Sequence, residues 1–276
     1  MHLGSLYSAV ASYLDARAHG GRWLLRIEDL DRPREALGSA DSILQTLQAF
    51  GLQWDGEVVR QRDRNELYDD ALQRLQSRGL TFECACSRLQ LEDESRYPGT
   101  CRLRAPAAGT ATATRLAVGP GLIQFTDRIQ GTFRQDVAAA VGDTILRRRD
   151  RVFAYLLAVV VDDAAQGVTH IVRGADLLDN TPRQIYLQRQ LGLPLPAYAH
   201  VPVLTEPDDS KLAKSRRSVR VDTGQALPQL LTVLSMLGLP VPAVLARATL
   251  AEVWDWAIGN WDVEWVPKRL NLRVNG

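Results

Sequence analysis

Two short segments near opposite ends of this chain carry residue types that handle phosphate. His2, Gly4 and Ser5 stand at the start of a stretch whose apolar residues follow helical spacing. The free N–H groups and positive dipole end of a helix N-terminus favour phosphate, and a glycine lets a flat base approach the backbone. Lys211 and Lys214 could place mobile positive charge on pyrophosphate. Each segment alone is more often a random match or a solvated loop, but together they indicate phosphoryl-transfer chemistry, which depends on positioning and electrostatics.

Three further segments lie between these two, in the order R-I-E-D-L-D at 26–31, F-A-Y leading into V-V-V-D-D at 153–163, and T-H-I-V-R-G-A-D at 169–176. The five segments in this order resemble class I aminoacyl-tRNA synthetases. His2 to Ser5 is similar to the H-I-G-H signature of that family, and Lys211 to Ser215 is similar to K-M-S-K-S. The other three resemble the glutamate-pocket segments of glutamyl-tRNA synthetases.

The resemblance implies an ATP-dependent ligase that activates L-glutamate and uses ATP with Mg²⁺. It implies catalytic roles for His2, Lys211 and Lys214, and ATP binding by His2, Gly4, Ser5 and Lys214. It further implies that Glu28 holds the ammonium group of the substrate, while Tyr155 and Arg173 hold the rest of the glutamate. An arginine fork suits a carboxylate because it can donate two parallel hydrogen bonds.

The cysteines suggest a metal site. Cys84, Cys86 and Cys101 are the three cysteines of the chain, and three thiolates need one more donor for a tetrahedral zinc site. On chemistry alone, free buried thiols are an equal alternative. The C-x-C spacing followed by Tyr97-x-x-x-Cys101 resembles the Zn²⁺ site of one short subfamily, the glutamyl-queuosine tRNA(Asp) synthetases, which implies that Cys84, Cys86, Tyr97 and Cys101 bind zinc.

Length agrees with this subfamily, which lacks the C-terminal anticodon-binding domain of glutamyl-tRNA synthetases. Only about 60 residues follow Ser215, too few for a further domain of typical size. The resemblance then implies transfer of glutamate to queuosine in the anticodon of tRNA(Asp), not to the tRNA 3′ end. Two alternatives stay open, a truncated glutamyl-tRNA synthetase that charges tRNA(Glu) and a non-catalytic RNA-binding paralogue.

Alternating strand-like and helix-like patterns predict an α/β fold with a parallel sheet, here a Rossmann-like class I synthetase catalytic domain with a zinc-containing insertion and a small C-terminal helical appendage. We expect residues 1–83 to form the first half of the nucleotide-binding fold, 84–135 the insertion, 136–220 the second half with the K-L-A-K-S loop, and 221–276 a helical subdomain. A buried strand is expected over 22–28. Capping boxes at 63–66 and 249–252 predict helix starts, as does Pro182.

Composition sets the remaining bounds. The 276 residues carry a formal net charge of +1, so an RNA would be bound through local patches such as the basic run 147–151, although a solvated face is the commoner interpretation of such a run. The longest apolar run, 153–161, is too short to span a bilayer, which needs about 20 residues. With no signal peptide we expect a cytoplasmic protein without membrane contact, and we expect a monomer.

Two features depart from the family pattern. The family has a strand with an R-F-A-P-S-P-T-G-like segment before its first signature, and this sequence begins at that signature. We therefore expect that the natural start lies upstream and that the chain as written folds poorly and is nearly inactive. Ala213 replaces the serine of the second signature, which removes one hydroxyl but no charge.

Overall fold

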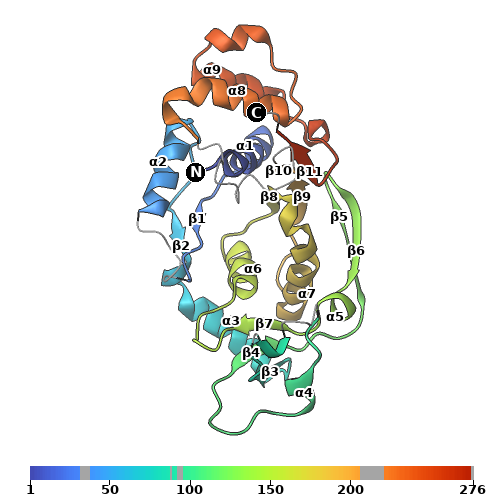
Figure 1. The fold of residues 1–276 in the computed structure, drawn as a ribbon. Helices are drawn as coiled ribbons and strands as arrows, with labels where there is room; N and C mark the ends of the chain where they lie inside the picture. The colour runs from blue at the N-terminus through green and yellow to red at the C-terminus, as the bar shows by residue number, and fades with distance from the viewer. Residues whose placement is uncertain (32–37, 88, 92–95, 206–220, 275–276) are drawn as a thin grey trace.

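The computed structural model of the chain describes residues 1–31, 38–87, 89–91, 96–205 and 221–274 (Figure 1). The α-helices are α1 (Leu3–Ala18), α2 (Ser39–Ala49), α3 (Asn65–Ser77), α4 (Thr100–Leu103), α5 (Val137–Ala140), α6 (Tyr155–Ala165), α7 (Thr181–Leu191), α8 (Ala226–Met236) and α9 (Leu250–Gly259). The strands are β1 (Arg26–Ile27), β2 (Val59–Arg60), β3 (Thr81–Cys84), β4 (Ala113–Leu116), β5 (Leu122–Asp127), β6 (Gly131–Asp136), β7 (Thr144–Arg147), β8 (His170–Gly174), β9 (Ala197–Val201), β10 (Val203–Thr205) and β11 (Asn271–Arg273).

The main sheet has the strand order β6-β5-β9-β8 and is mixed. β8 and β9 are parallel, with Arg173 opposite His200, and β5 joins β9 in parallel where Asp127 lies opposite Tyr198. The predicted parallel pairing is found in β5, β9 and β8, whereas β5 and β6 form an antiparallel hairpin that was not predicted. The turn between them uses Gly131 at φ 80°, a backbone conformation that glycine adopts without strain.

The first predicted strand is shorter than the pattern at 22–28 indicates. Only Arg26 and Ile27 form a ladder, in parallel with β2. Before that point the carboxylate of Asp55 accepts a hydrogen bond from the backbone N–H of Trp23 at 2.8 Å. The segment therefore runs beside residues 53–60, but the Trp23 N–H bonds a side chain instead of the neighbouring backbone. The strand ladder begins only at Arg26.

A second, three-stranded antiparallel sheet is built from β3, β4 and β7. It lies at one end of the molecule together with α4, while α8 and α9 lie at the other end over α1 (Figure 1). β5 and β6, at 122–136, belong to the main sheet. The division of the chain at 84 and 135 stays a prediction.

Two hydrophobic clusters form the interior. One contains Leu6, Val10 and Leu14 of α1 with apolar residues of α8 and α9, and the other joins α3, α6 and α7. β8 lies between them, because Val172 packs against the first cluster and Ile171 against the second. Successive side chains of a strand point to opposite faces, so Arg173 lies on the same face as Ile171, where its guanidinium lies over the ring of Tyr198. No helix among the described residues has the length and apolar character needed to cross a membrane.

Helix starts follow the sequence in part. Thr249 and Glu252 form the predicted capping box of α9, with Glu252 N donating to Thr249 Oγ1 at 3.3 Å, and α7 begins at Thr181 as predicted. The helix start predicted at 63–66 is confirmed, because α3 begins at Asn65, but the capping box itself is wrong. A 3-10 turn over Gln61–Asp63 leads straight into α3, whose N-cap is Arg64 without a side-chain cap bond.

The C-terminal part is not wholly helical. After α9 the chain returns to the body of the molecule, where β11 pairs in parallel with β10 and Leu204 lies opposite Leu272. This pairing was not expected, since three residues carry too little periodicity to identify a strand.

Candidate functional site

The His2 motif forms the N-terminus of α1. His2 is the N-cap residue, and its Nδ1 accepts a hydrogen bond from the backbone N–H of Ser5 at 3.2 Å. Its Nε2 lies 2.9 Å from Ser5 Oγ. Because Nδ1 accepts, the neutral ring carries its proton on Nε2 and donates to the serine hydroxyl. Burial and, to a lesser degree, the Met1 ammonium lower the pKa of His2, so the ring acts as a neutral hydrogen-bond donor at neutral pH.

The absence of a side chain at Gly4 leaves room for the His2 ring. A Cβ on Gly4 would lie 3.3 Å from both Cε1 and Nδ1 of His2, which is closer than carbon atoms normally pack. A cavity of about 640 Å³ opens beside the motif and is lined by Met1, His2, Thr46, Val221 and others. Ligand sites commonly measure about 300–1,000 Å³, so this cavity is large enough for a nucleotide.

Glu28 lies in a second cavity, of about 460 Å³, whose walls come from residues 25–31 and from Ser39 to Leu44 of α2. Arg26 Nη2 donates to Glu28 Oε1 at 3.2 Å and to Asp163 Oδ1 at 2.8 Å. The Glu28 side chain is 37% exposed, yet protein surrounds it on its other sides. Desolvation there raises the pKa of Glu28 against the effect of Arg26, and a bound cation would stabilise its carboxylate.

Tyr155 stands in the first turn of α6 and is 40% exposed. Burial raises the pKa of its hydroxyl, the Glu28 charge raises it further, and the Arg173 charge opposes both. The charges of Glu28 and Arg173 therefore both lie within electrostatic range of the Tyr155 hydroxyl. Glu28 directly follows β1, Tyr155 belongs to α6 and Arg173 belongs to β8.

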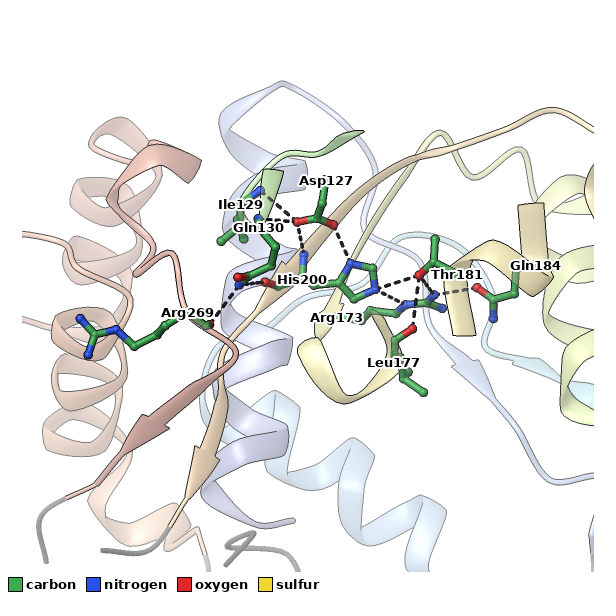
Figure 2. Close-up of polar contacts among 9 residues, drawn as sticks. All are labelled: Asp127, Ile129, Gln130, Arg173, Leu177, Thr181, Gln184, His200 and Arg269. Carbon is green, nitrogen blue, oxygen red and sulfur yellow. Dashed lines mark hydrogen bonds and ion pairs between the residues drawn. The ribbon is translucent and has the colours of Figure 1, made fainter. Parts of the chain in front are cut away.

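Arg173 is held on one side by a hydrogen-bonded network (Figure 2). Its Nε donates to His200 Nε2 at 3.1 Å, and its Nη2 donates to Thr181 Oγ1 at 2.9 Å and to Gln184 Oε1 at 2.6 Å. Within the part of the chain that the structure describes, Arg173 forms no ion pair with a carboxylate. A guanidinium in this state can bind an external carboxylate.

No sequence motif marks His200, Thr181 or Gln184 as a site residue. A possible clue was the histidine in the apolar segment A-H-V-P-V-L at 199–204, since a buried histidine needs polar partners. The identity of those partners depends on the pairing of β8 with β9.

The basic run at 147–151 serves the fold. Arg147 pairs with Asp69 at 3.3 Å, and Arg148 pairs with Asp31 at 2.6 Å. Arg149 donates to the carbonyl of Ala85 at 2.6 Å. Because their partners lie on other segments, these arginines tie the start of α6 to its surroundings.

Lys211 and Lys214 lie outside the described residues.

The three cysteines form a cluster, with their Sγ atoms within 4.8 Å of one another. Tyr97 Oη lies 3.4 Å from Cys84 Sγ and 3.9 Å from Cys86 Sγ. Tetrahedral zinc at about 2.3 Å from each sulfur separates the sulfurs by roughly 3.8 Å, and Cys86 Sγ lies 3.5 Å from Cys101 Sγ. The spacing and chemistry of this donor set fit zinc.

Comparison with known proteins gives the context of this geometry. A family model described as "tRNA synthetases class I (E and Q), catalytic domain" matches residues 1–230. The chain is 53% identical over 273 residues to a glutamyl-Q tRNA(Asp) synthetase of Pseudomonas syringae pv. tomato, covering 99% of this chain and 92% of the relative. It is 49% identical over 278 residues to the protein of that name from Dechloromonas aromatica, covering 98% and 92%.

Solved structures share the fold. A glutamate tRNA ligase from Elizabethkingia meningosepticum, in complex with its amino acid, superimposes with a TM-score of 0.82 at 22% identity, covering 99% of this chain and 64% of that one. The glutamate-tRNA synthetase of Elizabethkingia anophelis gives a TM-score of 0.84 at 22% identity, covering 100% and 66%. This chain therefore spans about two thirds of those synthetases.

Proposed function

This chain belongs to the class I tRNA synthetases for glutamate and glutamine, and from that premise we propose that it is an ATP-dependent ligase that attaches L-glutamate to queuosine in tRNA(Asp). The observation that carries the proposal is a pair of charges that suit a zwitterionic ligand: Glu28 lines a cavity of about 460 Å³, and Arg173 is bonded to three neutral acceptors and to no carboxylate among the described residues. The names of relatives about half identical over nearly the whole chain favour queuosine over the tRNA 3′ end as the acceptor. We expect the enzyme to act as a monomer in the cytoplasm, where tRNA is modified.

The charges of the site match glutamate. Glu28 offers an anion for the substrate ammonium, Arg173 offers a cation for a substrate carboxylate, and Tyr155 offers a hydroxyl. Arg26 orients Glu28 without neutralising it fully, because Arg26 also bonds Asp163 at 2.8 Å. A ligand with one positive and two negative groups is expected to bind better here than a neutral side-chain analogue, because an amide would leave the arginine without a charged partner.

ATP, with Mg²⁺, is expected at the N-terminus of α1. His2, the N-cap residue of α1, lines the larger cavity, and the dipole of a helix N-terminus favours phosphate. In the activation step an oxygen of the glutamate α-carboxylate attacks the α-phosphorus, and the bond to pyrophosphate breaks. Donors from His2 and Ser5, with Lys211 and Lys214, would stabilise the charge on the transferring and leaving phosphates. The activated glutamyl group then passes to a nucleophile of the RNA, with release of AMP.

Zinc is expected in addition to glutamate and ATP. Cys84, Cys86 and Cys101 would supply thiolates, and Tyr97 would complete the set with its hydroxyl oxygen. The Arg115 guanidinium lies 3.9 Å from the centre of the Tyr97 ring, where its positive charge offsets the negative charge of the thiolates. A closed set of four protein ligands is typical of structural zinc, so the metal would stabilise the sheet of β3, β4 and β7 and take no part in activation.

The activation step can be tested by glutamate-dependent exchange of labelled pyrophosphate into ATP. We expect exchange with L-glutamate and far less with L-glutamine or L-aspartate. No exchange with any amino acid, in protein shown to be folded, would reject the ligase and favour an RNA-binding role.

A further inference from the structure

The protein uses only part of the hydrogen-bonding capacity of Arg173. Its Nε and Nη2 groups point toward β9 and α7, where they reach His200, Thr181 and Gln184. Among the described residues Nη1 makes no hydrogen bond. Three neutral acceptors therefore hold one edge of the guanidinium, and its charge and remaining N–H groups stay available to a substrate.

His200 can accept from Arg173 only in one tautomer. Its Nδ1 lies 2.6 Å from Asp127 Oδ2, and an ionised carboxylate can only accept, so Nδ1 carries the proton and Nε2 carries the lone pair. Asp127 is itself fixed, since its Oδ1 accepts from the backbone N–H groups of Ile129 at 3.0 Å, Gln130 at 2.9 Å and His200 at 3.1 Å. Both side chains are 0% exposed.

We propose that Asp127 and His200 are positioning residues for Arg173. Asp127 fixes the tautomer of His200, and His200 fixes the rotation of the guanidinium (Figure 2), so that its Nη1 donors remain free for a glutamate carboxylate. This inference rests on the proposed binding of glutamate by Arg173. A preorganised arginine binds its ligand without first losing side-chain freedom.

A neutral acceptor suits this position better than an anion would. A carboxylate in direct contact with Arg173 would neutralise the cation and compete with the substrate. The His200 imidazole separates the Asp127 carboxylate from Arg173, and it offers the guanidinium only the lone pair of a neutral nitrogen as acceptor. The other charged or titratable groups that face His200 are Arg173 from β8, Asp176 from η4 (Ala175–Asn180) and Tyr198, whose ring stacks at 6.1 Å.

The decisive variant is Asp127→Asn. The amide oxygen can still serve the three backbone N–H groups, but the amide NH₂ then donates to Nδ1, and the imidazole proton moves to Nε2, where it opposes the Arg173 N–H. The corresponding carboxylate-to-amide change in a serine protease triad also acts through the wrong histidine tautomer. In pyrophosphate exchange we expect the KM for glutamate to rise about tenfold, with the KM for ATP changed less than about twofold.

A matched control is Asp136→Asn, in the same hairpin but at the N-cap of α5. Asparagine caps helices as well as aspartate does, so both KM values should be unchanged. Nitrogen NMR of labelled histidine should show the His200 proton on Nδ1 in the wild type and on Nε2 in Asp127→Asn.

A second pair of variants decides the question if Asp127→Asn does not fold. The longer amide of His200→Gln can place its oxygen where Nε2 was, whereas His200→Asn mimics only the Nδ1 side. The glutamate KM should therefore be lower in His200→Gln than in His200→Asn. If wild-type protein shown to be folded has no glutamate-dependent exchange, the proposed function fails. If the wild type is active but folded Asp127→Asn keeps its glutamate KM, or the two His200 variants have equal KM values, the positioning role is overturned.

Discussion

Replacing Asp162 by asparagine should destabilise the fold strongly. The Asp162 carboxylate on α6 is 0% exposed and accepts hydrogen bonds from Arg64 Nε at 2.6 Å, Gln61 Nε2 at 2.9 Å and Tyr68 Oη at 2.7 Å. Arg26 Nε lies 3.9 Å away. One carboxylate thus joins α6 to three residues at the start of α3, and the N-terminus of the same helix carries Tyr155.

The magnitude follows from these contacts. Asparagine offers one acceptor oxygen, so its NH₂ group must face at least one of the three donors. The Arg64 guanidinium also loses its only carboxylate partner among the described residues. Removing one member of a buried ion pair destabilises by about 3–5 kcal/mol. For a chain of this size 1 kcal/mol shifts the melting temperature by about 2–4 °C, so Asp162→Asn should melt roughly 10 °C below the wild type.

Urea unfolding followed by tryptophan fluorescence measures this difference. Asp69→Asn is the matched control, because Asp69 pairs with Arg147 at 3.3 Å but its side chain is 43% exposed. Exposed pairs contribute about 0.2–1 kcal/mol. If Asp162→Asn and Asp69→Asn lose the same unfolding free energy, the buried cluster does not hold α6 in place and the reasoning is wrong.

Three further predictions concern the site, the metal and pH. Arg173→Lys keeps the charge but loses the fork, so the KM for glutamate in pyrophosphate exchange should rise about 5–30-fold while that for ATP stays nearly constant; equal changes in both would reject the pocket assignment. Purified protein should contain about one zinc per chain, and Cys101→Ser should lower both metal content and melting temperature; intact thiols without metal would contradict the zinc site. Burial lowers the pKa of His200, so below about pH 6.5 the unfolded chain binds a proton that the folded chain does not, and the unfolding free energy should fall as pH drops. His200→Gln should flatten that slope in urea unfolding at pH 5 to 7, and an unchanged slope would show that His200 does not carry it.

The parts of the site that sequence could predict are those written in contiguous segments. Arg26 and Ile27 form a strand within the range that the pattern at 22–28 predicts, and Glu28 directly follows them. Cys84, Cys86 and Cys101 cluster as their spacing indicated. Local patterns suffice here because the residues concerned lie close together in the sequence.

The rest depends on pairings between distant segments. Asp127 and His200 are 73 positions apart and meet only because β5 joins β9. Asp162 and Tyr68 are 94 positions apart and meet through the packing of α3 on α6. No periodicity in one segment encodes its partner, so neither network could be identified from a single sequence.

The most direct test of the proposed function is transfer of labelled L-glutamate, with ATP, to purified tRNA(Asp) with and without queuosine, and to tRNA(Glu). We predict label on queuosine-containing tRNA(Asp) alone. Periodate blocks the 3′ end of tRNA, and we predict that tRNA(Asp) treated in this way still accepts glutamate if its queuosine is protected or restored. Label on tRNA(Glu), or on tRNA(Asp) regardless of queuosine, would contradict the account.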